Sequence, residues 1–63
     1  MNKPFTLIRW DRRDDEIELI KYAKAINAVR KAMEEIMWES TERVTVKDER
    51  TGETIFDERG TFA

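Results

Sequence analysis

Polar and apolar positions recur in three- and four-residue steps over one long stretch of the chain, residues 14–39. The apolar positions that this spacing places on one face of a helix are Leu19, Tyr22, Ile26, Val29, Met33, Ile36 and Met37. The opposite, solvated face would carry Glu16, Lys24, Asn27, Lys31, Glu34 and Glu35. The pattern predicts one amphipathic helix from Asp14 to Glu39, about 39 Å long at 1.5 Å per residue.

Segments rich in β-branched and aromatic residues lie on both sides of this helix. Residues 5–10 read Phe-Thr-Leu-Ile-Arg-Trp and follow Pro4, a breaker of regular structure. Residues 43–47 and 54–57 alternate between polar and apolar with a period of two. Three short strands are therefore expected, each about 20 Å long at 3.3 Å per residue.

The last two strands should form a hairpin. Asp48 favours the start of a type I turn, and Gly52 suits the positive φ of a following bulge. This turn predicts Asp48 opposite Glu53. The pairs that then follow along the hairpin are Val46 with Ile55 and Thr45 with Phe56.

The order strand, long helix, hairpin (β-α-β-β) predicts an α+β fold, with a three-stranded antiparallel or mixed sheet and the helix on one face. Val44, Val46 and Ile55 should meet the helix, with Phe56 on the other face. Beside Phe56 the first strand would place either Phe5 with Leu7 or Ile8 with Trp10. The chain is expected to be a single small domain, residues 1–63, with a flexible tail at residues 60–63.

The composition argues against catalysis and against metal or cofactor binding. The 63-residue chain contains no cysteine and no histidine, so the usual zinc and haem ligands, thiol nucleophiles and the commonest general base are missing. Its adjacent acidic residues should diverge into solvent instead of converging in a cleft. Residues 48–53 lack the ligand pattern of a calcium loop. We therefore expect no enzyme activity and no cofactor.

The chain also lacks an apolar run long enough to cross a membrane, and Met1 is not followed by a signal-peptide core. A cytoplasmic protein with no membrane partner is expected.

Charge is unevenly distributed, although the formal net charge is only −2. Residues 1–13 carry four basic side chains and one acidic, whereas residues 14–42 carry eight carboxylates and four basic groups. The basic residues Lys3, Arg9, Arg12 and Arg13 lie near Trp10, and such a cluster could bind single-stranded nucleic acid by stacking and phosphate contact. Alternatively, the arginines stay solvated and Trp10 packs.

Apolar residues outside the main stripe favour protein binding, because a helix that overhangs its sheet needs something else to pack on. Ala25, Ala28 and Ala32 form a small-residue edge that would let a second helix approach closely. Aromatic residues are enriched at interfaces. The residues predicted to bind a partner are Trp10, Ile17, Ile20, Ala25, Ala28, Ala32, Trp38 and Phe56. We expect a homodimer and a further protein partner.

Residues 5–37 resemble the organisation of small accessory and inhibitor proteins encoded by bacteriophages. The resemblance is carried by Asp14-Asp15-Glu16-Ile17-Glu18-Leu19, Ala25-Ile26-Asn27-Ala28 and Ala32-Met33-Glu34-Glu35-Ile36. It is one of pattern: a short strand, an acidic helix start and an amphipathic helix containing Ala and Asn. The hairpin at residues 42–58 has no counterpart in it. It implies a protein that binds and blocks a host factor in the host cytoplasm.

Three functions compete on the sequence alone. The favoured one is a small, acidic, non-catalytic protein-interaction module that self-associates and inhibits a host protein. The second is nucleic-acid binding by the basic N-terminal segment. The third is an acidic helix that imitates the phosphate backbone, although Lys21, Lys24 and Lys31 interrupt its acidic run.

Overall fold

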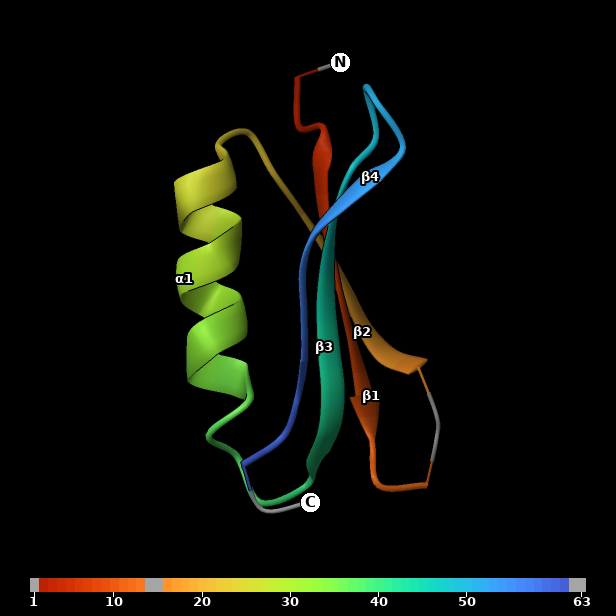
Figure 1. The fold of residues 1–63 in the computed structure, drawn as a ribbon, viewed down its shortest axis with the longest axis vertical. Helices are drawn as coiled ribbons and strands as arrows, with labels where there is room; N and C mark the ends of the chain where they lie inside the picture. Colours follow the sequence, from red (N-terminus) through yellow and green to blue (C-terminus); the bar gives the residue numbers. More distant parts are fainter. Residues whose placement is uncertain (1, 14–15, 62–63) are drawn as a thin grey trace.

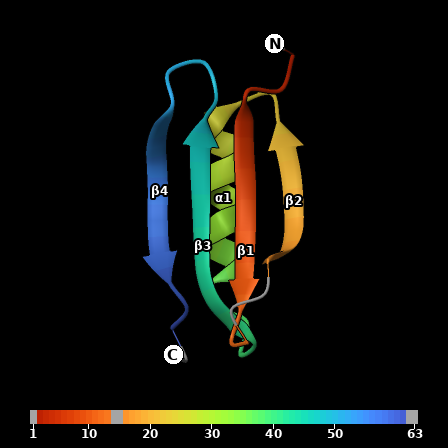
Figure 2. The ribbon, with the colours of Figure 1, turned by 90° about the vertical axis from the view of Figure 1, so that its right-hand side faces the viewer.

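The computed structural model describes residues 2–13 and 16–61 as a four-stranded antiparallel sheet with one helix across one face (Figures 1 and 2). The elements, in chain order, are β1 (Phe5–Asp11), β2 (Glu16–Tyr22), α1 (Ala25–Glu35), β3 (Thr41–Asp48) and β4 (Glu53–Arg59). The strand order across the sheet is β2-β1-β3-β4. The α+β class and the helix on one face are confirmed, whereas the sheet has four strands instead of three.

The first half of the predicted long helix is the strand β2. Its backbone pairs with β1 in a register that places Tyr22 beside Phe5 and Ile20 beside Leu7. The predicted helix start, Asp14, lies outside the described residues. Asp11 accepts a hydrogen bond from the Arg13 backbone N–H at 2.9 Å, in the connection that leads from β1 to β2.

The helix α1 has 11 residues, so at 1.5 Å per residue it is about 16 Å long and does not overhang the sheet. Its end comes before the predicted Glu39. The backbone N–H of Met37 donates to the Glu34 carbonyl at 3.2 Å and that of Trp38 to the Glu35 carbonyl at 3.1 Å, which tightens the final turn. The overhang that favoured partner binding is therefore absent.

The core lies between α1 and the two central strands. Ala28 and Ala32 are fully buried against Leu7, Val44 and Val46. The alanine side chain is a single methyl group, so the helix approaches the sheet closely. The small-residue edge thus faces the chain's own sheet, and not a second helix.

The β3–β4 hairpin begins as predicted and then shifts by one residue. Asp48 pairs with Glu53, and Gly52 has φ +77°, as expected. A bulge next to Val46 then pairs Val46 with Phe56 and Thr45 with Asp57. Because one extra residue reverses the side-chain faces, Phe56 packs against the core and Ile55 is 37% exposed, opposite to the prediction.

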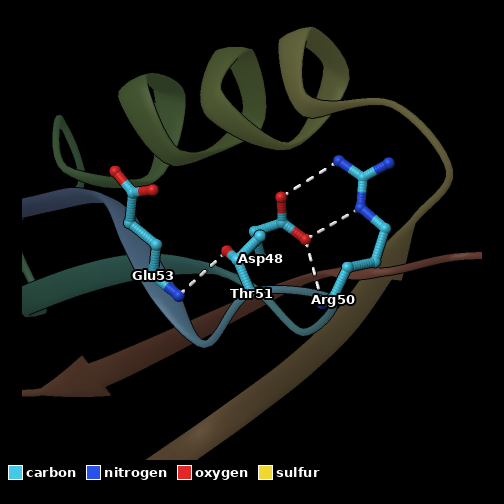
Figure 3. A network of polar contacts seen from close by, with 4 residues as sticks. All are labelled: Asp48, Arg50, Thr51 and Glu53. Atoms are coloured by element: carbon cyan, nitrogen blue, oxygen red, sulfur yellow. Dashed lines mark hydrogen bonds and ion pairs between the residues drawn. The ribbon is translucent and has the colours of Figure 1, made fainter.

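The turn of this hairpin is held by its own side chains (Figure 3). The carboxylate of Asp48 accepts hydrogen bonds from the backbone N–H and the guanidinium of Arg50, each at 3.0 Å. The Arg50 guanidinium also lies 5.0 Å from the centre of the Phe5 ring. The turn is therefore fastened to the start of β1.

The end of the chain is tied to the fold where the structure describes it. Gly60 is buried and its N–H donates to the Glu42 carbonyl at 2.9 Å, and the Thr61 N–H donates to the Ile36 carbonyl at 3.0 Å. Residues 60 and 61 of the predicted tail are thus anchored, while residues 62 and 63 lie outside the described residues.

Candidate interaction surfaces

The outer side of α1 carries a continuous row of large apolar side chains. Ile26, Met33 and Met37 are 62%, 56% and 60% exposed, and Val29 beside them is partly exposed. Their spacing of three and four residues places them on one side of the helix and of the turn that follows it. We call these four residues the outer stripe. Scattered exposed apolar residues are normal, but a contiguous row on a small domain indicates a binding surface.

The outer stripe exists because the largest apolar side chains of α1 do not face the sheet. The side that meets the sheet is made of alanines, and the larger side chains point elsewhere. The sequence pattern identified Ile26, Val29, Met33 and Met37 as the core-facing stripe of the helix. That assignment is wrong for the three strongly exposed residues. The predicted helix face also included Leu19 and Tyr22, which lie in β2 and therefore say nothing about which side of α1 meets the sheet.

Two opposite charges border the outer stripe. Together with the stripe, the residues that line one shallow apolar groove are Ala25, Arg30 and Glu34. Arg30 and Glu34 are exposed, and no ion pair to either of them is found among the described residues. The groove therefore has an apolar floor with one cation and one anion at its side.

A buried ion-pair network joins the other side of α1 to the sheet. The carboxylate of Glu35, 1% exposed, lies 3.6 Å from the Nε of Arg9, which is 5% exposed, and 3.4 Å from the Nζ of Lys31. Arg9 also donates hydrogen bonds of 2.8 Å to the hydroxyls of Thr41 and Ser40. Glu35, expected on the solvated face, is thus a structural group that links the helix to β1 and β3.

Trp38 covers this network. Trp38 is 52% exposed, and the Arg9 guanidinium lies 5.2 Å and the Lys31 ammonium 6.0 Å from the centre of its ring. Cation–π contacts of this kind fix an aromatic ring over charged groups. One side of Trp38 therefore packs on the charged groups that join α1 to the sheet, while the rest of the residue is exposed to solvent.

The sheet face opposite α1 is not covered by any element of the described chain (Figure 2). Trp10 lies here, half-buried, with the Arg43 guanidinium 5.2 Å from its ring centre. Arg43 donates two hydrogen bonds to Asp57, at 2.9 and 2.8 Å, and Arg59 pairs with Glu42 at 3.1 Å. The hydrogen bonds from Arg43 lower the pKa of the Asp57 carboxyl below its ordinary value, and the same contact raises the pKa of Arg43.

The predicted partner-binding residues do not form one surface. Ala28 and Ala32 are buried under the helix, whereas Ala25 and Phe56 are partly buried at the edge of the core, where Ile20 is also half-buried on β2. The residues of this set that remain on surfaces are Trp10, on the open sheet face, and Trp38, after α1. The side chain of Ile17 lies outside those described. Partner binding by this set stays a prediction.

The basic residues predicted to bind nucleic acid are separated as well. Arg9 is buried on the helix side of the sheet, so it offers no free guanidinium. Lys3 precedes β1, while Arg12 and Arg13 follow it, and the seven residues of β1 span about 23 Å. The Arg12 guanidinium is engaged by the Glu39 carbonyl. The N-terminal segment therefore supplies no compact basic patch.

No protein-family model, curated protein or solved structure matches this chain. The resemblance to bacteriophage accessory proteins stays a prediction. Within residues 2–13 and 16–61, no three acidic side chains gather into a potential metal site, and α1 is too short and too polar to cross a membrane.

Proposed function

We propose that this chain is a non-catalytic protein-interaction module that self-associates, and that the outer stripe of α1 is its binding surface. The observation that carries this proposal is the row Ile26, Val29, Met33 and Met37, whose three largest side chains are more than half exposed. Burying such a side chain fully is worth about 1.5–3 kcal/mol. A partner that covers the row therefore gains stabilisation from each of its three exposed side chains.

A charge placed within the stripe tests this proposal. Met33→Asp would put a carboxylate into the apolar contact, and the expected result is loss of self-association measured by light scattering on a sizing column. The matched control is Leu19→Asp, because Leu19 is 52% exposed but lies on β2, away from α1. Leu19→Asp should leave the mass of the wild-type particle unchanged.

Two results would contradict the proposal. One is a wild-type mass of 7.6 kDa, the mass of a single chain, at tens of micromolar. The other is a Met33→Asp variant that associates as well as the wild type while circular dichroism shows it folded.

Inhibition of a host protein is the second part of the proposed role, and it is supported by the pattern resemblance. The outer stripe is occupied in the self-associated form, so the inhibitor would be the dimer. The test is whether the purified chain lowers a candidate target's activity, and whether Met33→Asp, which prevents self-association, removes that effect while Leu19→Asp does not.

Nucleic-acid binding remains as a second candidate function, because the open sheet face places a tryptophan among basic side chains. The basic residues that β2, β3 and β4 direct to this face are Lys21, Arg43, Lys47 and Arg59. Against it, Arg43 is already paired with Asp57 and stacked on Trp10. Single-strand binding that falls steeply between about 50 and 200 mM salt and is lost in Lys21→Glu/Lys47→Glu would favour this candidate.

The phosphate-mimic alternative has less support. The helix residues Ala25–Glu35 include Glu34 and Glu35 as the only acids, and Glu35 is buried. A single exposed carboxylate on α1 cannot imitate a row of phosphates.

A further inference from the structure

We propose that the outer stripe of α1 is covered by α1 of a second copy running antiparallel, with Arg30 of each protomer paired with Glu34 of the other. This inference rests on the proposed function and names the partner and the orientation of the contact. It predicts a two-fold symmetric dimer in which the same surface is used by both chains.

The apolar residues of the stripe are spaced almost symmetrically about its midpoint, so the stripe can pack against an antiparallel copy of itself. The stripe runs from Ile26 to Met37, with Val29 and Met33 between them. When two such helices lie antiparallel with their midpoints aligned, Ile26 of one protomer faces Met37 of the other, and Val29 lies within one residue, about 1.5 Å, of the level of Met33. A long side chain at one end thus meets a shorter one at the other, and no apolar residue of the row is left facing a charge.

The bordering charges favour the same orientation. A two-fold axis that relates antiparallel helices keeps a given flank of both helices on the same side of the interface. Arg30 and Glu34 share one flank and lie one helical turn apart on either side of the stripe's centre. Each Arg30 therefore meets the partner's Glu34, and two ion pairs form by symmetry.

A parallel pair would not give this match. Its two-fold axis runs along the helices and places the Arg30 flank of one protomer beside the sheet side of the other. Parallel helices also align their dipoles unfavourably, whereas antiparallel helices align them favourably. An unrelated acidic or basic partner would satisfy only one of the two charges.

The sheet does not obstruct such a contact. At 100° per residue, Ala28 and Ala32, which face the sheet, lie about 120° around α1 from the centre of the stripe. Figure 1 shows α1 standing on one side of the sheet with its outer side free. Two helices can therefore meet through the stripe while both sheets point away from the contact.

Charge exchange tests the ion pairs. Arg30→Glu and Glu34→Arg should each weaken the homodimer about tenfold, because each places two like charges together. The double variant Arg30→Glu/Glu34→Arg restores opposite charges at both contacts and should recover wild-type affinity within about threefold. Mixing the two single variants should give heterodimers tighter than either homodimer. Equal affinities for the two single variants, the double variant and the mixture would overturn the pairing of Arg30 with Glu34.

Cross-linking tests the orientation, and the chain suits it because it has no cysteine of its own. Ile26→Cys mixed with Met37→Cys should give a disulfide-linked dimer under mild oxidation. Ile26→Cys alone should not, since the antiparallel arrangement holds the two copies of residue 26 about 16 Å apart. Efficient cross-linking of Ile26→Cys with itself would show a parallel pair and overturn the inference.

These results separate this inference from the proposed function. If Met33→Asp abolishes the dimer but charge exchange and cross-linking disagree with the antiparallel pair, the stripe is the interface and its orientation is wrong. If Met33→Asp has no effect on a wild-type dimer, the proposed surface itself is wrong.

Discussion

The two glycines of the chain have different physical roles. Gly52 has φ +77° with open space around the position of a Cβ, whereas a Cβ on Gly60 would overlap the backbone carbonyl of Thr41. Gly52→Ala should therefore cost only the backbone strain, about 1 kcal/mol of unfolding free energy.

Gly60→Ala should cost more, about 2–3 kcal/mol, because the chain end must move and the hydrogen bond from Gly60 to Glu42 is lost. Urea denaturation of both variants checks the order. A Gly60→Ala variant as stable as Gly52→Ala would show that the end of the chain is not anchored.

Stability in acid should depend on two carboxylates paired with arginine. Hydrogen bonds from Arg50 lower the pKa of Asp48, and those from Arg43 lower the pKa of Asp57. A group whose pKa is lower in the folded state stabilises the fold above its unfolded pKa, about 3.9, and this contribution is lost as the pH falls through the folded pKa. The melting temperature should fall between pH 5 and pH 2.

The variant Asp57→Asn should show a smaller decrease over the same pH range, because the titrating group has been removed. Parallel melting curves followed by circular dichroism measure the difference. Identical slopes for wild type and variant would mean that the Arg43 pair does not contribute.

Among the elements, β1, β3 and the turn after β3 were predictable from the sequence, whereas β2 was not. The strands near residues 5–10 and 43–47 and the turn at Asp48 and Gly52 have strong local signals. Residues 16–22 fit a helix face through Leu19 and Tyr22, but they also alternate enough to form a strand. Pairing with β1 decided the outcome, and residues 12–15 between the two strands contain no glycine or asparagine that would have signalled a hairpin turn.

The exposure of the outer stripe, the proposed binding surface, was also not predicted. The alanine edge at Ala25, Ala28 and Ala32 was a visible sign of close packing, but the sequence does not say whether a sheet or a second helix fills that space. Once the alanines face the sheet, Ile26 and Met33 must face away. The position of the outer stripe therefore follows from the sheet, which the local pattern did not define.

The network around Arg9 fastens α1 to the sheet, so its loss should destabilise the whole fold. Arg9→Met removes one partner of a buried pair and leaves the Glu35 carboxylate with only Lys31 nearby. The expected cost is about 3–5 kcal/mol of unfolding free energy. Denaturant titration beside the exposed control Arg13→Met, expected within about 0.5 kcal/mol of wild type, measures it. A similar effect for both would contradict this role.

At the scale of the whole molecule, the core is very small. Leu7 lies at its centre, fully buried between β2 and β3. Leu7→Ala should cost about 3–5 kcal/mol, which matches the total stability expected for a core of this size, so the variant should be largely unfolded at 25 °C. Leu19→Ala, the same change at a 52% exposed site, should remain folded. Circular dichroism distinguishes them, and a folded Leu7→Ala chain would show that the core extends further than Leu7.

The strand order has a consequence for how the chain reaches this structure. Strands β1 and β2 are neighbours in sequence, as are β3 and β4, so each pair can form rapidly as a local hairpin. The central pair, β1 with β3, joins a strand that precedes α1 in the sequence to one that follows it, so this pairing closes the longest loop. Docking of two preformed hairpins should therefore limit the folding rate. Substitutions that weaken either hairpin or the contact between β1 and β3 would therefore slow folding, whereas those in contacts that form only after docking would mainly speed unfolding.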